Sequence, residues 1–192
     1  DHSNVYLSSK FVSDIAEKLT NKKMEIIDSI SHEDHFQLNN NHTNKKYVAV
    51  LNCHFLKGGQ ELLYLLYHLD FNIPLIGIIT EISGDFDKKI IEGFEWRNQK
   101  NDINILFRNK IENIKNIYQE CEIILVPSLV DETYCRVAYE AMKNNIKIIS
   151  YRNGNLKYLL KDYKNNIFIE NPLVSIGNYN DENIYLDNKF LI

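Results

Sequence analysis

The sequence predicts an α/β fold, a Rossmann-like parallel sheet with helices on both of its faces. From Lys46 onward, short runs rich in Ile, Val and Leu alternate with longer segments that repeat their apolar residues at helical spacing. The short runs are apolar on both sides, which is typical of strands inside a parallel sheet. With 192 residues, of which 44% are hydrophobic, the chain can form one well-packed domain of this class, or one domain and a remnant of another.

The expected elements can be placed in order along the chain. Before residue 31, short strands at 5–7 and 24–27 are expected around a helix at 10–19, which Ser8 or Ser9 can cap. Residues 31–46 are polar and without periodicity, so we expect a linker or exposed loop and place a domain boundary there. The strands expected after the linker are 47–51, 74–80, 103–107, 122–126, 147–150 and 167–169. The helices expected among them are 59–69, 87–96, 110–118, 134–144 and 156–160, with 181–192 as a further candidate.

The composition argues against several classes of protein. A net charge of −4 gives no basic excess for binding nucleic acid or an anionic membrane through bulk charge. No apolar run approaches the roughly 20 residues that span a bilayer, and the start does not read as a signal peptide. Cys53, Cys121 and Cys135 are widely spaced, which argues against a disulfide framework or a CxxC zinc site and favours a reducing compartment. We therefore expect a cytoplasmic protein, and the missing initial Met suggests a piece of a longer chain.

The segment 122–140 places two carboxylates beside a strand-to-helix turn. Ser128 follows an apolar strand, and a loop leads to a helix that we expect to begin near Tyr134. Ligands of open parallel sheets bind at such turns, where the unpaired amides of a first helical turn can hold a phosphate or a sugar oxygen. Glu140, off the centre of the helix's apolar stripe, could accept hydrogen bonds from a ribose diol, and Glu132 could face the group attached to the phosphates.

A plainer interpretation of the same segment remains open. Arg136 and Glu140 have the spacing of an ordinary i,i+4 surface pair, and Glu132 could be a solvated loop acid. Spacing alone favours this interpretation. Cys135, at the start of the same helix, is expected to have a lowered pKa because of the helix dipole, but no histidine close in sequence would make it a nucleophile.

A second candidate turn follows the strand at 47–51. Lys57 and the two glycines after it put a cation and an uncrowded backbone at the start of a helix, a combination suited to a diphosphate. The segment is neither GxGxxG nor GxxxxGK[ST], and a lysine beside a glycine-rich turn is common. His54 in the same turn could donate to a ligand oxygen, although a lone loop histidine is more often structural. Alone, this turn is a weak indication of function.

Together the two turns resemble a known family. The segments YVAVLNCHFLKGGQELLYLL, EIILVPSLVDETYCRVAYEAMKNNIKIISYRNGNLKYLL and NNIFIENP are similar, in order and spacing, to the C-terminal domain of GT-B retaining glycosyltransferases of the family 4 type. That family has a phosphate-binding Lys-Gly after its first strand and a PS…ExFGxxxxEAM segment. The matching residues are Lys57, Gly58, Pro127, Ser128, Glu132, Tyr134, Cys135, Glu140, Ala141 and Met142. The match covers residues 46–172, and residues 4–30 resemble the last elements of the N-terminal domain.

The resemblance implies roles for the matching residues. Lys57 would neutralise the donor diphosphate, where negative charge builds up as it leaves, and Glu140 would bind the ribose hydroxyls. Glu132 would face the donor sugar, so Lys57 and Glu132 are the implied catalytic residues. Amides of 134–136 would contact phosphate or sugar, and the turn 107–109 would border the base. The implied donor-binding residues are Asn52, Lys57, Gly58, Phe107, Arg108, Asn109, Ser128, Tyr134, Cys135, Arg136 and Glu140. Such enzymes need no bound metal or other cofactor.

The chain departs from the family pattern at several positions. Asn52 replaces the phosphate-binding Arg five residues before the Lys, and Cys135 replaces a Gly and could crowd the backbone's approach to the sugar. Asn145 and Lys147 stand where Gly and Pro are usual, and Tyr158 where an acidic residue often follows a Gly-Gly turn. These departures predict altered donor choice or weak activity rather than a different fold.

The expected function is that of a retaining glycosyltransferase of the hexosyltransferase type, with a nucleotide-diphosphate sugar such as a UDP- or GDP-sugar as donor. Residues 46–192 would be its nucleotide-sugar-binding domain, and residues 1–45 a remnant of the N-terminal domain plus the linker. The acceptor, a glycan, a lipid or a protein, would bind the missing N-terminal domain, so this chain alone is expected to transfer poorly. The alternatives are a non-catalytic nucleotide-sugar-binding or scaffold domain and a GT-B sugar-nucleotide epimerase.

Overall fold

Parallel strands form one sheet in the order β5-β4-β3-β6-β7-β8. In this computed structural model, residues 6–27, 35–38, 45–68, 73–78, 84–100, 105–108 and 113–169 are described. The strands are β3 (Tyr47–Leu51), β4 (Leu75–Ile78), β5 (Ile105–Arg108), β6 (Cys121–Val126), β7 (Lys147–Tyr151) and β8 (Asn166–Ile169). The chain begins the sheet at the centre, extends it to one side, then returns to build the other side. This is the Rossmann strand order, and the predicted α/β class is confirmed.

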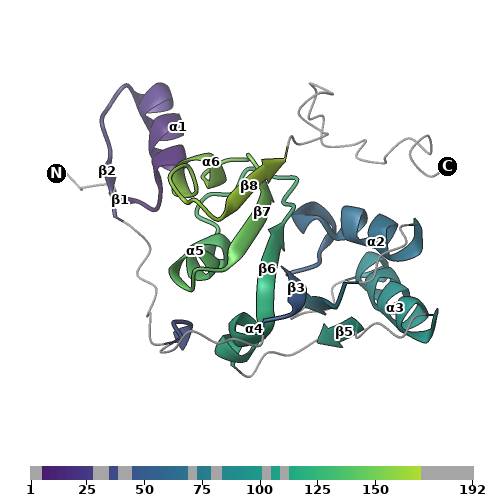
Figure 1. Cartoon of the computed structure of the whole chain (residues 1–192). Helices are drawn as coiled ribbons and strands as arrows, with labels where there is room; N and C mark the ends of the chain where they lie inside the picture. Colours follow the sequence, from purple (N-terminus) through teal and green to yellow (C-terminus); the bar gives the residue numbers. More distant parts are fainter. Residues whose placement is uncertain are drawn as a thin grey trace.

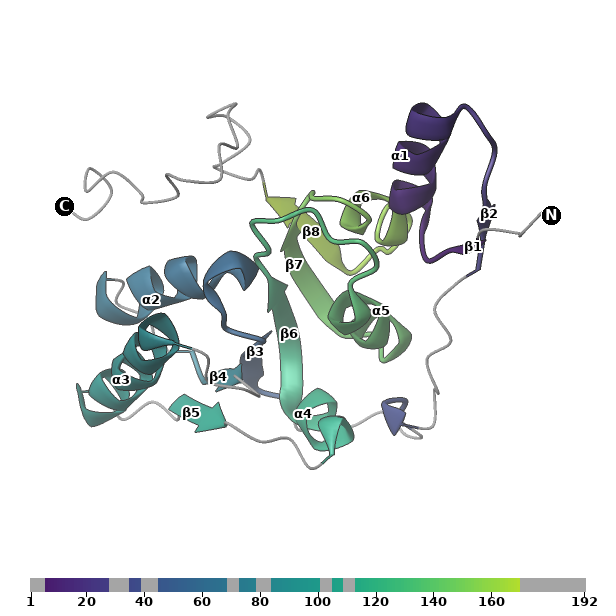
Figure 2. The ribbon, with the colours of Figure 1, turned by 180° about the vertical axis from the view of Figure 1, so that it is seen from behind.

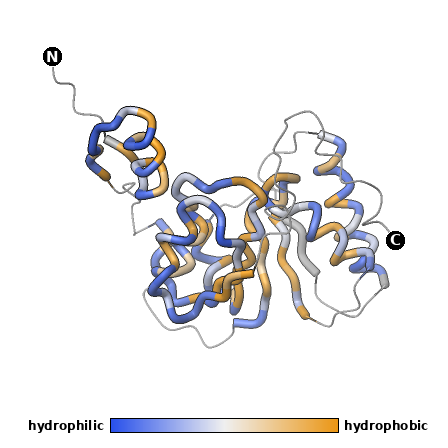
Figure 3. The backbone as a smooth tube through the Cα atoms, turned by 90° about the horizontal axis from the view of Figure 1, so that it is seen from above, coloured by the Kyte–Doolittle hydropathy of each residue, from blue (hydrophilic) through white to orange (hydrophobic). Residues whose placement is uncertain are grey.

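Helices lie on both faces of the sheet (Figures 1 and 2), and an apolar cluster on each face holds them there. The helices are η2 (Phe55–Lys57), α2 (Gly59–His68), α3 (Asp85–Lys100), α4 (Ile114–Glu120), α5 (Arg136–Lys143) and α6 (Leu156–Leu159). Helices α2 and α3 pack around Val50 on one face, while α4, α5 and α6 pack with Ala49 on the other. Because neighbouring residues of β3 face opposite clusters, its apolar run is buried on both sides. Figure 3 shows hydrophobic residues concentrated along the strands in the middle of the molecule.

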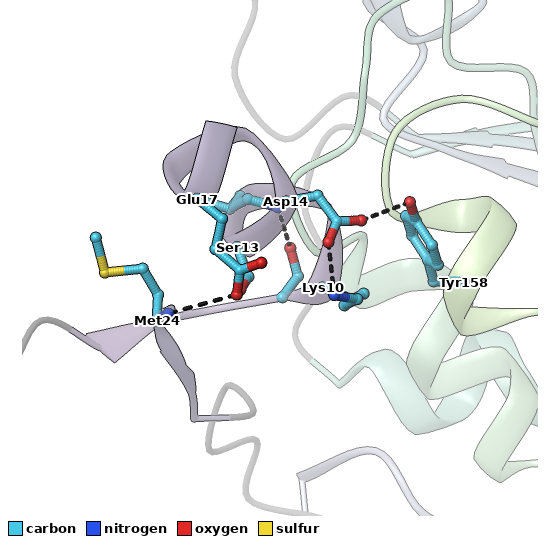
Figure 4. Close-up of polar contacts among 8 residues, drawn as sticks. Lys10, Ser13, Asp14, Glu17, Met24 and Tyr158 are labelled. Atoms are coloured by element: carbon cyan, nitrogen blue, oxygen red, sulfur yellow. Dashed lines mark hydrogen bonds and ion pairs between the residues drawn. The ribbon is translucent and has the colours of Figure 1, made fainter. Parts of the chain in front are cut away.

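The first described segment is a small unit of its own beside α6 (Figures 1 and 2). Its strands β1 (Tyr6–Leu7) and β2 (Glu25–Ile26) pair in parallel, and α1 (Lys10–Thr20) connects them. The side chain of Ser9 caps α1 by accepting from the amide of Val12 at 3.4 Å. The hydroxyl of Tyr158 on α6 donates to Asp14 Oδ2 at 2.7 Å, and Lys10 also pairs with Asp14, at 2.6 Å (Figure 4). Tyr158 therefore contacts α1.

Part of the expected linker is anchored in the core. Phe36 is 2% exposed and belongs to the cluster under α4, α5 and α6. Asn144, at the end of α5, fixes the backbone of this segment at two points. Its side chain donates to the carbonyl of Phe36 at 3.1 Å and accepts from the amide of Leu38 at 2.8 Å. The expectation of an exposed loop is therefore wrong at this point. Two apolar residues, Phe36 and Leu38, within a polar stretch leave no periodic pattern that would reveal the contact.

The expected elements are otherwise confirmed, with shifted ends. Helix α5 begins at Arg136, two residues later than predicted, because Cys135 has a left-handed φ of 64° that cannot continue a helix. Helix α3 is longer at both ends than the predicted 87–96. The candidate helix at 181–192 lies outside the described residues. No helix in the described part of the chain has the length and apolarity to cross a membrane.

Candidate functional site

Most candidate residues follow the ends of strands and so lie at the carboxyl edge of the sheet, which is the upper end of β6 in Figure 1. Strands β3 and β6 are hydrogen-bonded neighbours at the centre of the sheet. From β3 the chain continues to β4 on one side, and from β6 to β7 on the other. The two loops that leave these strands therefore diverge, and a crevice between such loops is where open α/β sheets bind their ligands.

An ion pair joins the two loops across this point. Lys57 Nζ lies 2.6 Å from Glu132 Oε1, although the residues are 75 positions apart in the sequence. The side chain of Glu132 is 12% exposed and that of Lys57 is 34% exposed, so the pair is partly shielded from water. The structure thus brings together the two residues that the resemblance named as catalytic. A cation and a carboxylate at one spot can hold an anionic group and a polar group side by side.

Gly58 keeps the two loops in contact. Its φ of 89° favours glycine, and a Cβ atom there would overlap the ring and the carbonyl of Pro127. Nearby, the amide of Leu129 donates to the carbonyl of Leu56 at 3.0 Å. Glycine is therefore required at position 58, where the two loops touch.

A third loop, after β7, holds the loop of Glu132 from the other side. The amide of Asn155 donates to the carbonyl of Glu132 at 2.6 Å, and the amide of Gly154 donates to Asp131 Oδ1 at 2.8 Å. The side chain of Asn153 donates to the carbonyl of Ser128 at 2.8 Å. No role of these loop residues was predicted from the sequence. The run Asn-Gly-Asn directly after a buried strand was the signal that could have revealed them.

Cys135 lies where the loop of Glu132 enters α5. The residue is only partly buried, yet desolvation of its thiol, followed by the negative Glu132 nearby, raises its pKa to about 12. The expected lowering by the helix dipole is wrong, because desolvation penalises the thiolate more than the dipole stabilises it. The thiol is therefore a neutral group of the site.

Glu140 is buried rather than solvated. It is 5% exposed, and Tyr118 of α4 donates its hydroxyl to Glu140 Oε2 at 2.7 Å. Arg136 Nη2 lies 3.4 Å from the other oxygen, Oε1, and the side chain of Arg136 is 76% exposed. The interpretation of Arg136 and Glu140 as an ordinary surface pair is wrong on this point, because only the arginine is at the surface. A buried carboxylate with one exposed partner is suited to exchanging that partner for a ligand.

Ser128 and Tyr134 are built into the loop between β6 and α5. Ser128 is 1% exposed, and its hydroxyl donates to the carbonyl of Val130 at 3.2 Å. Tyr134 is 9% exposed, and its carbonyl accepts from the side chain of Asn155 at 3.3 Å. The side chain of Ser128 and the backbone of Tyr134 therefore contribute to the shape of the loop that carries Glu132.

The remaining predicted residues lie toward the β5 side of the same edge. Asn52 follows β3, has a left-handed φ of 75°, and donates its amide to the carbonyl of Ile78 at 2.9 Å. Phe107 and Arg108 end β5, two strands away from β3, and Asn109 lies outside the described residues.

His54, in the loop after β3, has a partner in the structure. Its Nδ1 lies 3.0 Å from Oδ1 of Asp87, whose side chain is 5% exposed on α3. This contact ties the loop that carries Lys57 to α3. Within the described residues, no group of three or more His, Cys, Asp or Glu side chains could hold a metal ion.

Comparison with known proteins places these features in context. The profile of the family described as "Glycosyl transferases group 1" matches residues 30–182. An uncharacterized glycosyltransferase of Methanocaldococcus jannaschii is 31% identical over 114 residues, which are 59% of this chain and 30% of that protein. The crystal structure of Anabaena Alr3699/HepE in complex with UDP and glucose aligns with a TM-score of 0.68 and 16% identity, over 91% of this chain and 52% of that one.

A further solved structure covers one domain. The crystal structure of the C-terminal domain of a group 1 glycosyl transferase (LpcC) from Francisella tularensis aligns with a TM-score of 0.52 and 20% identity. The alignment covers 74% of this chain and 80% of that one. The chain thus spans about half the length of the Anabaena protein and under a third of the Methanocaldococcus relative.

Proposed function

The chain belongs to the group 1 glycosyltransferases, and we propose that its α/β domain binds the nucleotide-diphosphate sugar that serves as donor in a retaining transfer. The observation that carries this proposal is the pair of Lys57 and Glu132, which meet at the point where the loops after β3 and β6 diverge. The Anabaena neighbour, whose fold is similar, was crystallised in complex with UDP and glucose. A donor of the same chemical class carries an anionic diphosphate for Lys57 and a polar sugar for Glu132.

The diphosphate would take Glu132's place as the partner of Lys57. A phosphate is doubly suited to the position, because the ammonium group attracts it and the first-turn amides of α5 offer further donors. As the bond to the sugar breaks, negative charge grows on the diphosphate, and a cation placed in advance stabilises that charge. Glu132, released from Lys57, would face the sugar.

The ribose of the nucleoside would lie toward α5, and its base toward the end of β5. Glu140 would accept hydrogen bonds from the ribose hydroxyls, with Arg136 moving aside. Residues 107–109 would border the base. Because of where their loops lie, further residues would line the donor site: Asn52, Gly58, Ser128, Tyr134 and Cys135. Asn52 offers no charge to the diphosphate, so Lys57 would be its main cationic partner.

We also propose that the acceptor binds a further domain. The unit β1-α1-β2 is a parallel pair of two-residue strands with one connecting helix, and its apolar residues Ile15 and Leu19 are 42% and 81% exposed. Such a pair is too small to be stable alone. A larger N-terminal domain that contains this unit would cover these residues, and donor binding by the present chain would occur without efficient transfer.

Calorimetric titration with UDP- and GDP-sugars tests the proposal. Lys57→Ala should weaken the binding of the preferred donor by about tenfold or more, since it removes a hydrogen bond between charged groups. The matched control is Lys88→Ala, because Lys88 is also paired with a carboxylate, Asp85 at 2.8 Å, but lies on the surface of α3. Equal affinities of the Lys57→Ala variant and the unaltered protein, or no binding of any donor by the folded protein, would contradict the proposal.

A non-catalytic nucleotide-sugar-binding domain is the second candidate. Cys135 at a left-handed position and Asn52 in place of a cation favour it, because both reduce the site's fit to the reacting groups. The two functions separate in one experiment. A full-length protein that binds the donor tightly, yet neither hydrolyses nor transfers its sugar to any supplied acceptor, would support the second candidate.

A further inference from the structure

A buried hydrogen bond connects the helix that precedes β6 in the sequence with the helix that follows it. Tyr118 belongs to α4, which precedes β6, and Glu140 belongs to α5, which follows it. Tyr118 is 0% exposed, and its ring lies in the same apolar cluster as Ala138 and Ala141 of α5. At the far end of this ring the hydroxyl donates to Glu140 Oε2 at 2.7 Å. A phenylalanine would fill the same apolar space, so packing alone does not explain the hydroxyl.

The two oxygens of Glu140 have unlike partners. Oε2 is held by a short bond from a rigid, fully buried ring, whereas Oε1 has only a longer contact of 3.4 Å from the 76% exposed Arg136 side chain. Burial and the adjacent carboxylate raise the pKa of Tyr118 above its ordinary value, so the hydroxyl stays protonated and acts as the donor. The carboxylate is therefore held closely at one oxygen, while the other oxygen is contacted by an exposed side chain.

We propose that Tyr118 is a positioning residue whose hydroxyl holds Oε2 of Glu140 and thereby presents Oε1 to the ribose diol of the donor. The inference rests on the proposed function, because it assumes that Glu140 binds the ribose. Both hydroxyls of a ribose can donate to a single carboxylate oxygen, which has two lone pairs. A carboxylate that cannot rotate loses less conformational freedom when the ligand binds, and this preorganisation adds to the affinity.

The test compares ligands that differ only in the diol. UDP, GDP and ADP, each with its 2′,3′-dideoxy analogue, are titrated into the unaltered protein and into the Tyr118→Phe variant. In the variant we expect the affinity for the ribonucleoside diphosphate to fall about tenfold, the usual order for a hydrogen bond to a charged group, and the affinity for the dideoxy analogue to change by less than about twofold. The ratio of the two affinities should fall accordingly.

The control removes a comparable hydroxyl elsewhere. Tyr163 donates its hydroxyl to the carbonyl of Ile146 at 2.7 Å, at the other end of α5, so Tyr163→Phe should leave the ratio unchanged. If the role of Tyr118 were merely structural, Tyr118→Phe would lower the affinities for the ribonucleotide and for its dideoxy analogue equally. If Tyr118→Phe does not fold, the substitution is made together with Glu140→Gln and compared with Glu140→Gln alone, because the amide is neutral yet can still be oriented by the hydroxyl.

The outcomes separate this inference from the function on which it rests. If the unaltered protein binds none of the three diphosphates, the proposed function fails. If it binds one and prefers ribose to dideoxyribose, but the ratio of affinities is the same without the Tyr118 hydroxyl in either background, the inference is wrong and the proposed function stands. If removing the Tyr118 hydroxyl in either background lowers the ratio of ribonucleotide to dideoxynucleotide affinity, the result supports both the inference and the proposed function.

Discussion

Cys135 has a backbone conformation that costs most side chains free energy. Among the described residues other than glycine, positive φ angles occur at Asn21, Asn52, Cys135 and Asn145. Three of these are asparagines, whose side chains tolerate the left-handed region, so Cys135 is the exception. Its side chain packs against the cluster under α5, which offsets part of the strain. The strain lies between Glu132 and Glu140, at the entrance to the helix that carries the proposed ribose site.

The raised pKa of Cys135 predicts slow alkylation. With a folded pKa of about 12 against an ordinary 9.0, very little thiolate exists at pH 8. Iodoacetamide should therefore modify Cys135 at least about a hundredfold more slowly in the folded protein than in urea, since the thiolate is the nucleophile. Mass spectrometry of the peptide that contains residue 135 measures both rates. Rapid modification of the folded protein at pH 8 would contradict the expectation.

The same shift gives a dependence of stability on pH. The folded pKa lies above the unfolded one, so the contribution of this thiol to stability is complete below about pH 9 and is lost progressively as the pH rises from 9 toward 12. Cys53, whose pKa burial also raises to about 12, acts in the same direction. Urea unfolding at pH 8 and pH 10 should therefore show a less stable protein at pH 10, and replacing Cys135 by Ser should reduce the difference.

Single residues show what the sequence could predict of the site and what it could not. Lys57 and Glu132 were predicted from the resemblance, but their direct contact depends on β3 and β6 being neighbours, which no local pattern encodes. The hydrogen bond from Tyr118 to Glu140 was not predicted, because an aromatic residue on the apolar side of a helix resembles any core residue. The predicted lowering of the pKa of Cys135 was wrong, because the burial of this thiol depends on loops that are distant in the sequence.

Helix α5 ends in a well-formed C-cap. The amide of Ile146 donates to the carbonyl of Ala141, and that of Asn145 to the carbonyl of Met142, each at 3.0 Å, the paired bonds of a Schellman motif. Asn145 has the left-handed φ of 52° that the motif requires. This end of α5 lies opposite the end that enters the candidate site. The departure at Asn145 therefore concerns the cap, where asparagine is the usual substitute for glycine, rather than the choice of donor.

The cap makes a prediction about Asn145→Gly. Glycine adopts a positive φ without the cost of a Cβ, so the free energy of unfolding should rise by about 0.5 kcal/mol, even though the exposed hydrogen bond from Asn165 is lost. The neighbouring Asn144→Gly is the contrast, because Asn144 has a negative φ and its side chain holds residues 36 and 38. That variant should be destabilised by at least about 1 kcal/mol. Urea unfolding measures both, and a clear loss of stability in Asn145→Gly would contradict the prediction.

The arrangement of the whole sheet explains why the fold class was predictable and the site only in part. Apolar runs on both faces predicted parallel strands with helices on each side, and the residues of each strand depend little on which strand is its neighbour. The order of the strands depends on long-range packing. That order decides which loops diverge, so it places the loops of Lys57 and Glu132 together and sets Phe107 and Arg108 two strands away.

We expect the segment before β3 that contains Phe36 to be part of the folded domain. Phe36 is fully enclosed by residues of the sheet and of α4 and α5, although it precedes the boundary expected at residue 46. Phe36→Ala should lower the free energy of unfolding by about 3 kcal/mol, the usual cost of emptying a buried phenylalanine site. Leu19→Ala, at a position 81% exposed on α1, is the control and should change it by less than about 0.5 kcal/mol. Equal stabilities of the two variants would mean that the packed domain begins only at β3, whereas the expected difference would extend it to the segment of Phe36.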